Sequence, residues 1–190
     1  MVVLMISVQA RAQIQINPQL GFNFMGYTNP PEGADYKAEA GFMLGCDLRF
    51  GERFQLQPGL FYMSTKSVTE LENSGGTVEG DIEHGWIRLK GFGAYNLIDG
   101  ESFKLRVNGG PSYDFLLSAK NQDGDDVKDD LNKGNFSMNL GLGADIWIIT
   151  ADLGYSFGFS DVFSDENVSP DSKYQGLYFT VGVIFGDGKD

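Results

Sequence analysis

The sequence predicts an all-β fold: a closed, eight-stranded, antiparallel up-and-down transmembrane β-barrel. Eight segments alternate between apolar and polar residues, which is typical of strands with one apolar and one polar face. Most of these segments run beyond the roughly nine to eleven residues that a tilted strand needs to cross a bilayer. The connections alternate between short turns and long polar segments, as expected for a closed series of antiparallel hairpins.

The first four expected strands carry apolar residues on alternate positions, with mostly polar residues between them. Their apolar residues are Ile14, Ile16, Leu20, Phe22 and Phe24 in 14–25; Ala38, Ala40, Phe42, Leu44, Cys46, Leu48 and Phe50 in 37–50; Phe54, Leu56, Leu60 and Tyr62 in 54–66; and Ile87, Leu89, Tyr95 and Leu97 in 82–97. Successive strand side chains leave on opposite faces, so each of these segments has an apolar face.

The last four expected strands follow the same pattern. Their apolar residues are Phe103, Leu105, Val107, Pro111, Tyr113, Phe115 and Leu117 in 103–118; Phe136, Met138, Leu140, Leu142, Ala144, Ile146 and Ile148 in 135–148; Leu153, Tyr155, Phe157 and Phe159 in 151–160; and Leu177, Phe179, Val181, Val183 and Phe185 in 174–185. The strand at 103–118 alternates almost without error.

The connections differ in length at the two ends of the predicted barrel. Short turns are expected at 51–53, 98–102 and 149–150, and long polar loops at 26–36, 67–81, 119–134 and 161–173. With an even number of strands, both termini lie at the end with the short turns. Bacterial outer-membrane barrels have this asymmetry, with short periplasmic turns and longer extracellular loops.

Alternation alone does not decide whether the apolar face points inward, as in a soluble lipocalin-like barrel, or outward to lipid. Aromatic residues on the apolar face favour lipid, because they form two groups that resemble the interfacial girdles of membrane barrels. One group lies near the short turns and one near the long loops: Phe50, Phe54, Tyr95, Phe103 and Phe185, and Phe24, Tyr62, Phe115, Phe136 and Phe159. The soluble ligand-binding barrel is the less favoured alternative.

Residues 1–12 have the features of a secretory signal peptide. Residues 1–8 are largely apolar, and Ala10-Arg11-Ala12 matches the small-residue cleavage pattern. No basic residue precedes the apolar stretch, so we expect the first residue to lie inside a longer signal. Export would leave residues 13–190 as a single barrel domain; an ordinary apolar first strand is the alternative for the signal.

The net charge argues against one class of binding partner, and the cysteine content limits what can hold the fold together. The chain has 190 residues, a formal net charge of −12 and a pI of about 4.4, which argues against a nucleic-acid partner. Cys46 is the only cysteine, so backbone pairing must supply the framework in place of an internal disulfide.

Charged residues on the polar face are expected to fill the lumen as a network of structural ion pairs. An eight-stranded barrel has an interior just wide enough for side chains, and charges removed from water need partners. The predicted network consists of Asp47, Arg49, Arg88, Lys90, Lys104, Arg106, Asp114, Asp145 and Asp152. It predicts a plugged lumen, and a narrow pore for ions or small solutes is the alternative.

The residue patterns do not predict an enzyme, a cofactor or a metal site. His84 has Ser67, Asp81 and Glu83 near it in sequence, but no spacing indicates the base, nucleophile and orienting group that nucleophilic catalysis needs. The segment 121–130 is rich in carboxylates, which suit Ca²⁺. It lacks the ligand order of an EF-hand loop, and a solvated loop explains it better.

Four motifs give the chain a resemblance to a known family. They are Gly21-Phe22-Asn23, the run FQLQPGLFY at 54–62, GGPSY at 109–113 and LGLGAD at 140–145. In their order and spacing, they make the chain similar to the PorT-like outer-membrane β-barrel proteins that are common in Bacteroidetes. The resemblance implies an eight-stranded outer-membrane barrel in a family whose founding member is tied to type IX secretion.

These observations predict an integral outer-membrane protein that is exported through the periplasm. We expect a non-enzymatic, structural or interactive role: presenting acidic loops outside the cell, or assisting envelope assembly or secretion. The expected partners are the lipid bilayer and envelope or secretion-machinery proteins, and the barrel is expected to be a monomer.

Overall fold

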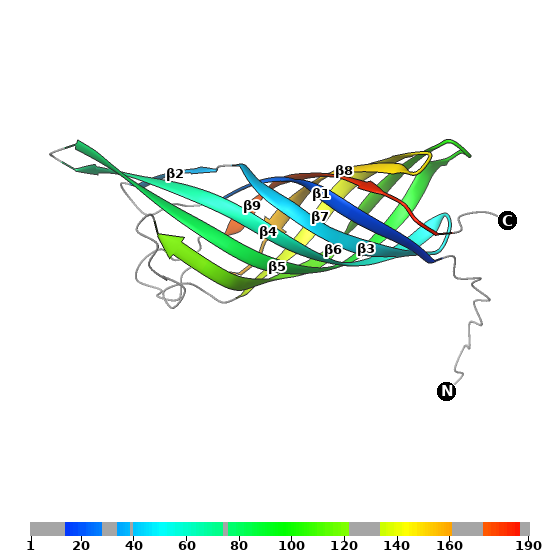
Figure 1. Ribbon diagram of the computed structural model, residues 1–190, viewed down its shortest axis with the longest axis horizontal. Helices are drawn as coiled ribbons and strands as arrows, with labels where there is room; N and C mark the ends of the chain where they lie inside the picture. The colour runs from blue at the N-terminus through cyan, green and yellow to red at the C-terminus, as the bar shows by residue number, and fades with distance from the viewer. Residues whose placement is uncertain are drawn as a thin grey trace, which may run out of the picture.

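The computed structural model describes residues 14–27, 34–38, 40–73, 76–121, 134–160 and 173–186. These residues form one antiparallel sheet that closes on itself where β4 pairs with β5 (Figure 1). The strands are β1 (Ile14–Tyr27), β2 (Ala34–Ala38), β3 (Ala40–Phe50), β4 (Phe54–Asn73), β5 (Gly76–Asp99), β6 (Phe103–Asn121), β7 (Gly134–Ile146), β8 (Ile149–Gly158) and β9 (Tyr174–Val183). Within these ranges, no helix has the length and apolar character needed to cross a membrane.

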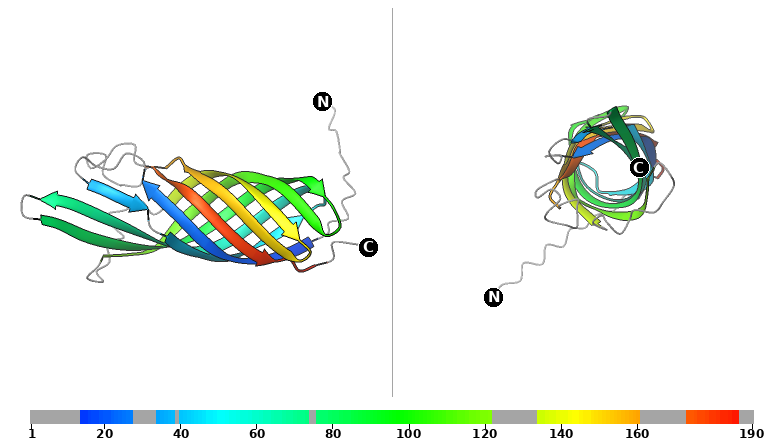
Figure 2. Two further views of the ribbon diagram at one scale, coloured as in Figure 1. Left: turned by 90° about the horizontal axis from the view of Figure 1, so that it is seen from above. Right: turned by 90° about the vertical axis from the view of Figure 1, so that its left-hand side faces the viewer.

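Eight of the strands form the wall of the barrel, in the order β4-β3-β1-β9-β8-β7-β6-β5. The short strand β2 lies outside this ring and pairs only with the distal part of β4. Figure 2 shows the ring end-on, and Figure 1 shows the start of β1 and the end of β9 at the side of the short turns. The predicted closed, eight-stranded antiparallel barrel is confirmed.

Most of the side chains buried in the lumen are polar, and apolar side chains cover the outer surface. Along β7, Asn135, Ser137 and Asn139 are buried inside the barrel, whereas Phe136 and Met138 are exposed. Large apolar side chains in contact with water are unfavourable, and a continuous outer layer of them suits lipid. The arrangement opposes the soluble lipocalin-like alternative, in which the apolar face points inward.

The aromatic residues of the two expected girdles lie on the outer surface. Exposed members near the short turns are Phe54, Tyr95, Phe103 and Phe185, and those near the loops are Phe24, Tyr62, Phe115, Phe136 and Phe159. Phe50 is only half-exposed. The outer surface is therefore apolar in the middle and aromatic toward both ends, as in membrane barrels.

The prediction of a loop at 67–81 is wrong, because both strands continue through most of it. β4 and β5 stay paired from Lys66↔Glu83 to Asn73↔Gly76, well past the end of the barrel wall. This hairpin leaves the lipid region, so its two faces no longer need to differ in polarity and the apolar–polar alternation disappears. The other predicted loops, 26–36, 119–134 and 161–173, lie largely outside the described residues.

Several strand boundaries also differ from prediction. The expected turn at 98–102 is shorter, because β5 continues to Asp99. The expected strand 37–50 is divided into β2 and β3, with Glu39 outside the described residues. The expected turn at 149–150 lies instead at Trp147 and Ile148, because Ile149 already pairs with Ile146. No glycine or asparagine marks this turn, so the residues there carry no turn signal.

Candidate functional site

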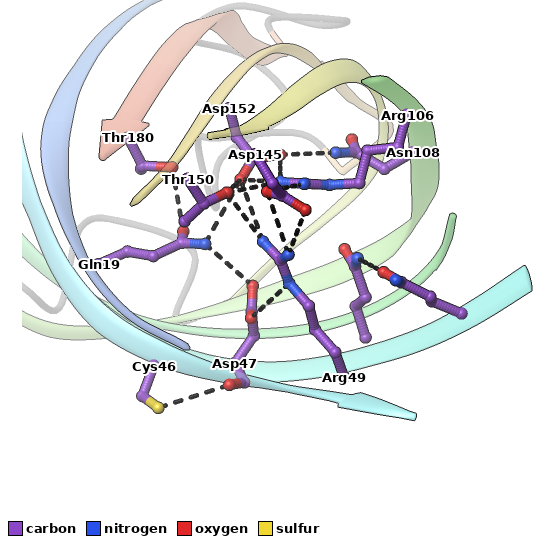
Figure 3. A network of polar contacts seen from close by, with 12 residues as sticks. Gln19, Cys46, Asp47, Arg49, Arg106, Asn108, Asp145, Thr150, Asp152 and Thr180 are labelled. Carbon is purple, nitrogen blue, oxygen red and sulfur yellow. Dashed lines mark hydrogen bonds and ion pairs between the residues drawn. The ribbon is translucent and has the colours of Figure 1, made fainter. Parts of the chain in front are cut away.

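The lumen near the short turns is closed by a layer of paired charges (Figure 3). Arg106 of β6 bonds to Asp145 of β7, and its Nη2 lies 2.7 Å from both carboxylate oxygens of Asp152 on β8. Arg49 reaches the same layer from β3, with Nη1 3.1 Å from Asp145 Oδ2. Thr150 Oγ1 accepts hydrogen bonds from both arginines at 2.9 Å. The layer therefore ties β3 to three strands across the lumen.

A second set of contacts extends this layer toward the loop end. Lys90 Nζ lies 2.8 Å from Asp47 Oδ2. The same ammonium group lies 4.5 Å from the ring centroid of Phe61 and 4.9 Å from that of Phe92, within range of cation–π attraction. Gln19 donates to Asp47 at 3.3 Å and also reaches the arginine layer. Lys90 is thus held by an anion and two aromatic faces.

Arg88 and Asp114 form a separate ion pair farther toward the loops. They face each other on neighbouring strands β5 and β6. Arg88 Nε and Nη2 lie 2.6 and 2.7 Å from the two carboxylate oxygens of Asp114, a bidentate geometry. Both side chains are buried, and Asn135 of β7 donates to Asp114 at 3.4 Å.

The charges in the described part of the lumen balance. Four cations, Arg49, Arg88, Lys90 and Arg106, face four anions, Asp47, Asp114, Asp145 and Asp152, and every one of them has an ionic partner. Equal numbers of opposite charges in contact are what a narrow interior with little water requires.

Lys104 does not join this network, although it was predicted to. Its Nζ lies 3.0 Å from Asp99 Oδ1, and its side chain is 29% exposed. Lys104 is the second residue of β6 and therefore lies at the rim of the barrel, where water can solvate it.

Apolar side chains occupy the lumen nearer the loops, and our sequence analysis did not predict them. The buried cluster consists of Met43, Phe61, Met63, Trp86, Phe92, Leu116 and Tyr178. Tyr174 stacks on Trp86, with ring centroids 6.2 Å apart. The alternation of side chains along β4 could have predicted them. Phe61 and Met63 are an even number of residues from the inward-facing Gln57, so they lie on the same face of the strand. The described side chains in the lumen therefore form an ionic part and an apolar part.

His84 lies at the loop end of this cluster and has no catalytic arrangement around it in the described part of the chain. It is buried, with its ring centroid 6.1 Å from that of Trp86. Neither ring nitrogen has a hydrogen-bond partner among the described residues. The side chains of Ser67, Asp81 and Glu83 lie outside the described set.

Two cavities of the described barrel bear on what the lumen can hold. One of about 20 Å³ lies in mid-lumen beside Lys90 and Tyr178, with room for about one water. A second, of about 320 Å³, opens at the short-turn end and is bounded by Asp145. Apart from Asn121, the carboxylate-rich segment 121–130 lies outside the described residues, which hold no group of three acidic, histidine or cysteine side chains suited to a metal.

Several solved outer-membrane proteins have the same fold. Ail of Yersinia pestis, crystallised with the heparin analogue sucrose octasulfate, matches with a TM-score of 0.50 and 14% identity over 91% of this chain and 99% of Ail. OprG of Pseudomonas aeruginosa matches with a TM-score of 0.53 and 10% identity over 94% and 98%. Neisserial surface protein A matches with a TM-score of 0.50 and 13% identity over 90% and 97%.

Sequence comparison identifies the family. No curated protein sequence matches the chain. A family model described as the outer membrane protein beta-barrel domain matches residues 8–164, most of the chain. The barrel with its apolar outer surface, the solved outer-membrane proteins of the same fold and this match agree. The chain belongs to the outer membrane protein beta-barrel domain family and is a protein of the outer membrane.

Proposed function

We propose that this protein is a non-conducting, non-enzymatic barrel that holds a β-hairpin and acidic loops outside the cell for contact with other proteins. The observation that carries the proposal is the β4–β5 hairpin, whose pairing continues far beyond the barrel wall. Figure 2 displays the hairpin as a projection from the end opposite the short turns. Short turns face the periplasm in bacterial barrels, so the projection faces outward.

The hairpin is a regular, continuously paired β-structure. Eight residue pairs extend it from Lys66↔Glu83 to Asn73↔Gly76, which corresponds to roughly 25 Å at the rise of a strand. β2 adds a third strand by pairing along β4 from Ala38↔Ser67 to Ala34↔Leu71. A two-stranded ribbon alone is marginally stable in water, so the third strand supports the projection.

The charge of the hairpin indicates the kind of surface it would meet. Residues 67–81 include Glu70, Glu72, Glu79 and Asp81 and contain no lysine or arginine. Together with the net charge of −12, this favours a partner with a basic surface.

A shortened hairpin tests the proposal. Ser67 and Ile82 are cross-strand partners, so residues 68–81 can be replaced by Asn-Gly to form a two-residue turn at that point. We expect the variant to keep the heat-modifiable mobility of a folded barrel on gels but to lose the proteins that cross-link to the native protein in its own membrane. An unchanged set of cross-linked proteins would oppose a role for the hairpin.

Kinship, export and oligomeric state are proposed from the sequence. We infer kinship with the PorT-like proteins of Bacteroidetes from the four motifs, a cleaved signal at residues 1–12, and a monomeric barrel. An accessory role in secretion or envelope assembly is one form of the proposed interaction. Cross-linked partners drawn from a secretion apparatus would favour that form.

A further inference from the structure

The distal part of β5 has an open edge. β6 pairs with β5 only as far as Ile82↔Asn121, whereas β5 continues along β4 beyond that point. Residues Gly76–Asp81 therefore have β4 on one side and, among the described residues, no strand on the other. Figure 1 shows the hairpin reaching farther than the end of β6. The other side of distal β4 is covered by β2. An unpaired strand edge is a template for another strand.

The register of the hairpin identifies the backbone groups at this edge. The Asn96 N–H donates to Arg53 O at 2.9 Å, so Asn96 is bonded toward β4. No register shift interrupts the pairing of β4 with β5 from there to the tip. Successive residues of an antiparallel strand direct their N–H and C=O groups to opposite sides. Every second residue counted from Asn96 therefore bonds to β4, and Thr77, Glu79 and Asp81 direct their backbone groups to the open edge.

A row of acidic residues ends at the same edge. Asp35 of β2 lies opposite Glu70 of β4, and Glu70 lies opposite Glu79 of β5. Lys37, the one basic residue of β2, belongs to the neighbouring row, opposite Val68. Like charges directly opposite each other destabilise a sheet. A cation on a strand added beside β5 would offset this repulsion, so the row favours a basic strand.

We propose that an extended, basic segment of another protein binds to Gly76–Asp81 as an added antiparallel strand. Backbone hydrogen bonds to Thr77, Glu79 and Asp81 supply affinity, as in other cases of strand addition. The residues opposite these three lie on the face of the sheet that carries the acidic row, so the segment has lysine or arginine at every second position. The inference rests on the proposed function, because it names the kind of partner that the hairpin meets.

A second copy of the chain does not suit this edge. An antiparallel pair of two such edges, bonded through the same backbone groups, would bring Glu79 opposite Glu79, and like charges in that position are unfavourable. Residues 76–81 also contain no lysine and no proline, two residues that commonly protect an edge against added strands. The acidic residues thus oppose pairing between copies and leave the edge available to a basic strand.

Synthetic peptides test strand addition on the full chain folded in a neutral detergent. The probe is a short fluorescent peptide in which lysine alternates with threonine or valine, and fluorescence anisotropy measures its binding. Methylation of the backbone nitrogens of the lysines removes the donors that face β5 and keeps the charge, so binding should be lost. Methylation at the threonine and valine positions affects only the far edge of the added strand, so this matched control should still bind.

Two results would overturn strand addition. One is the absence of binding by the unmethylated peptide. The other is equal binding of the three peptides, or of a peptide with the same residues and its lysines grouped together, because attraction between charges alone would then explain it.

The variant Glu79→Lys tests the role of charge at the edge. An attraction becomes a repulsion, so binding of the lysine peptide should weaken by about five- to tenfold, and a peptide with glutamate in place of lysine should gain affinity. Glu72→Lys is the matched control, because it changes the net charge equally on β4, one strand away from the edge. Equal effects of the two variants would contradict the proposal. Heat-modifiable mobility on gels verifies that both variants fold.

Cross-linking in the native membrane separates this inference from the proposed function. If the shortened hairpin loses its cross-linked proteins but Glu79→Lys retains all of them, contact through the hairpin stands and strand addition at this edge is wrong. If both variants retain them, both proposals are wrong. Loss of the same proteins in both variants, with retention in Glu72→Lys, is the result that we expect.

Discussion

Arg106 connects three acceptors on two strands: Asp145, Asp152 and Thr150. Its guanidinium is buried, so these contacts replace the water that it has lost. Removal of this one cation leaves two buried carboxylates with a single nearby arginine, Arg49. The residue therefore contributes more through the charges that it neutralises than through its own hydrogen bonds.

Arg106→Ala should lower the free energy of unfolding by on the order of 3 kcal/mol, because two buried carboxylates, Asp145 and Asp152, would then share the single cation Arg49. Urea unfolding of the protein in phospholipid vesicles, followed by heat-modifiability on gels, measures the loss. Lys104→Ala is a matched control on the same strand. Its pair with Asp99 is partly solvated, and such pairs contribute at most about 1 kcal/mol. Equal effects of the two substitutions would contradict the predicted role of Arg106.

The pair formed by Arg88 and Asp114 allows a cleaner experiment. Arg88→Met and Asp114→Leu should each destabilise the barrel by about 3 kcal/mol, since each leaves the other charge buried and alone. The double variant removes both charges and should be less destabilised than either single variant. A double-mutant cycle of unfolding free energies gives the coupling, and strictly additive losses would show that the two side chains do not act as a pair.

At the scale of the element, close strand contacts limit which glycines can be replaced. A Cβ at Gly21 of β1 would collide with the backbone of Phe179 and would lie 2.7 Å from the Cα of Thr180 on β9. Gly91 of β5 faces open space, with no atom within 4 Å of such a Cβ. The two glycines therefore have different reasons to be present, although both lie within strands.

Gly21→Ala is expected to cost about 1–3 kcal/mol of stability, since the backbone of β9 must move to accommodate the methyl group. Gly91→Ala should be neutral or stabilising by up to about 1 kcal/mol, because alanine loses less backbone entropy on folding. Urea midpoints in vesicles compare the two variants under identical conditions. A large loss for Gly91→Ala would mean that another protein packs closely against this glycine.

At the scale of the whole molecule, the described part of the lumen holds two layers of buried side chains. The ionic layer around Arg49 and Arg106 lies toward the end with the short turns, and the apolar cluster around Phe61 and Trp86 lies in the part nearer the loops. Between them lies a cavity with room for about one water. An ion crossing the barrel would need both parts to rearrange.

The protein should therefore show no steady conductance in planar bilayers. The measurement uses the complete chain inserted from detergent, with insertion verified by heat-modifiable mobility of the recovered protein. A large and stable single-channel conductance would instead support the alternative of a narrow pore for ions or small solutes.

The barrel and the charged residues on its inner face could be predicted because lipid imposes a strict contrast between the two faces of each strand. Strands could not be predicted where that contrast ends. Residues 67–81 lack the apolar–polar alternation of the barrel strands and are rich in polar residues and glycine, so they resemble a loop. The apolar part of the lumen was also missed, because the inner face of one strand holds both polar and apolar residues, as with Gln57 and Phe61 on β4. The turn at Trp147 was missed because its backbone conformation is unusual for its residue type.

The continuity of β4 and β5 has a mechanical consequence. Both strands run without a break from the short turns to the distal hairpin. A partner that pulls on the hairpin would load both strands along their length, and the force would pass to the flanking ladders with β3 and β6. Hydrogen bonds in these ladders lie across the direction of pull, so many of them resist shear together. The projection is thus suited to bearing tension while the barrel stays seated in the membrane.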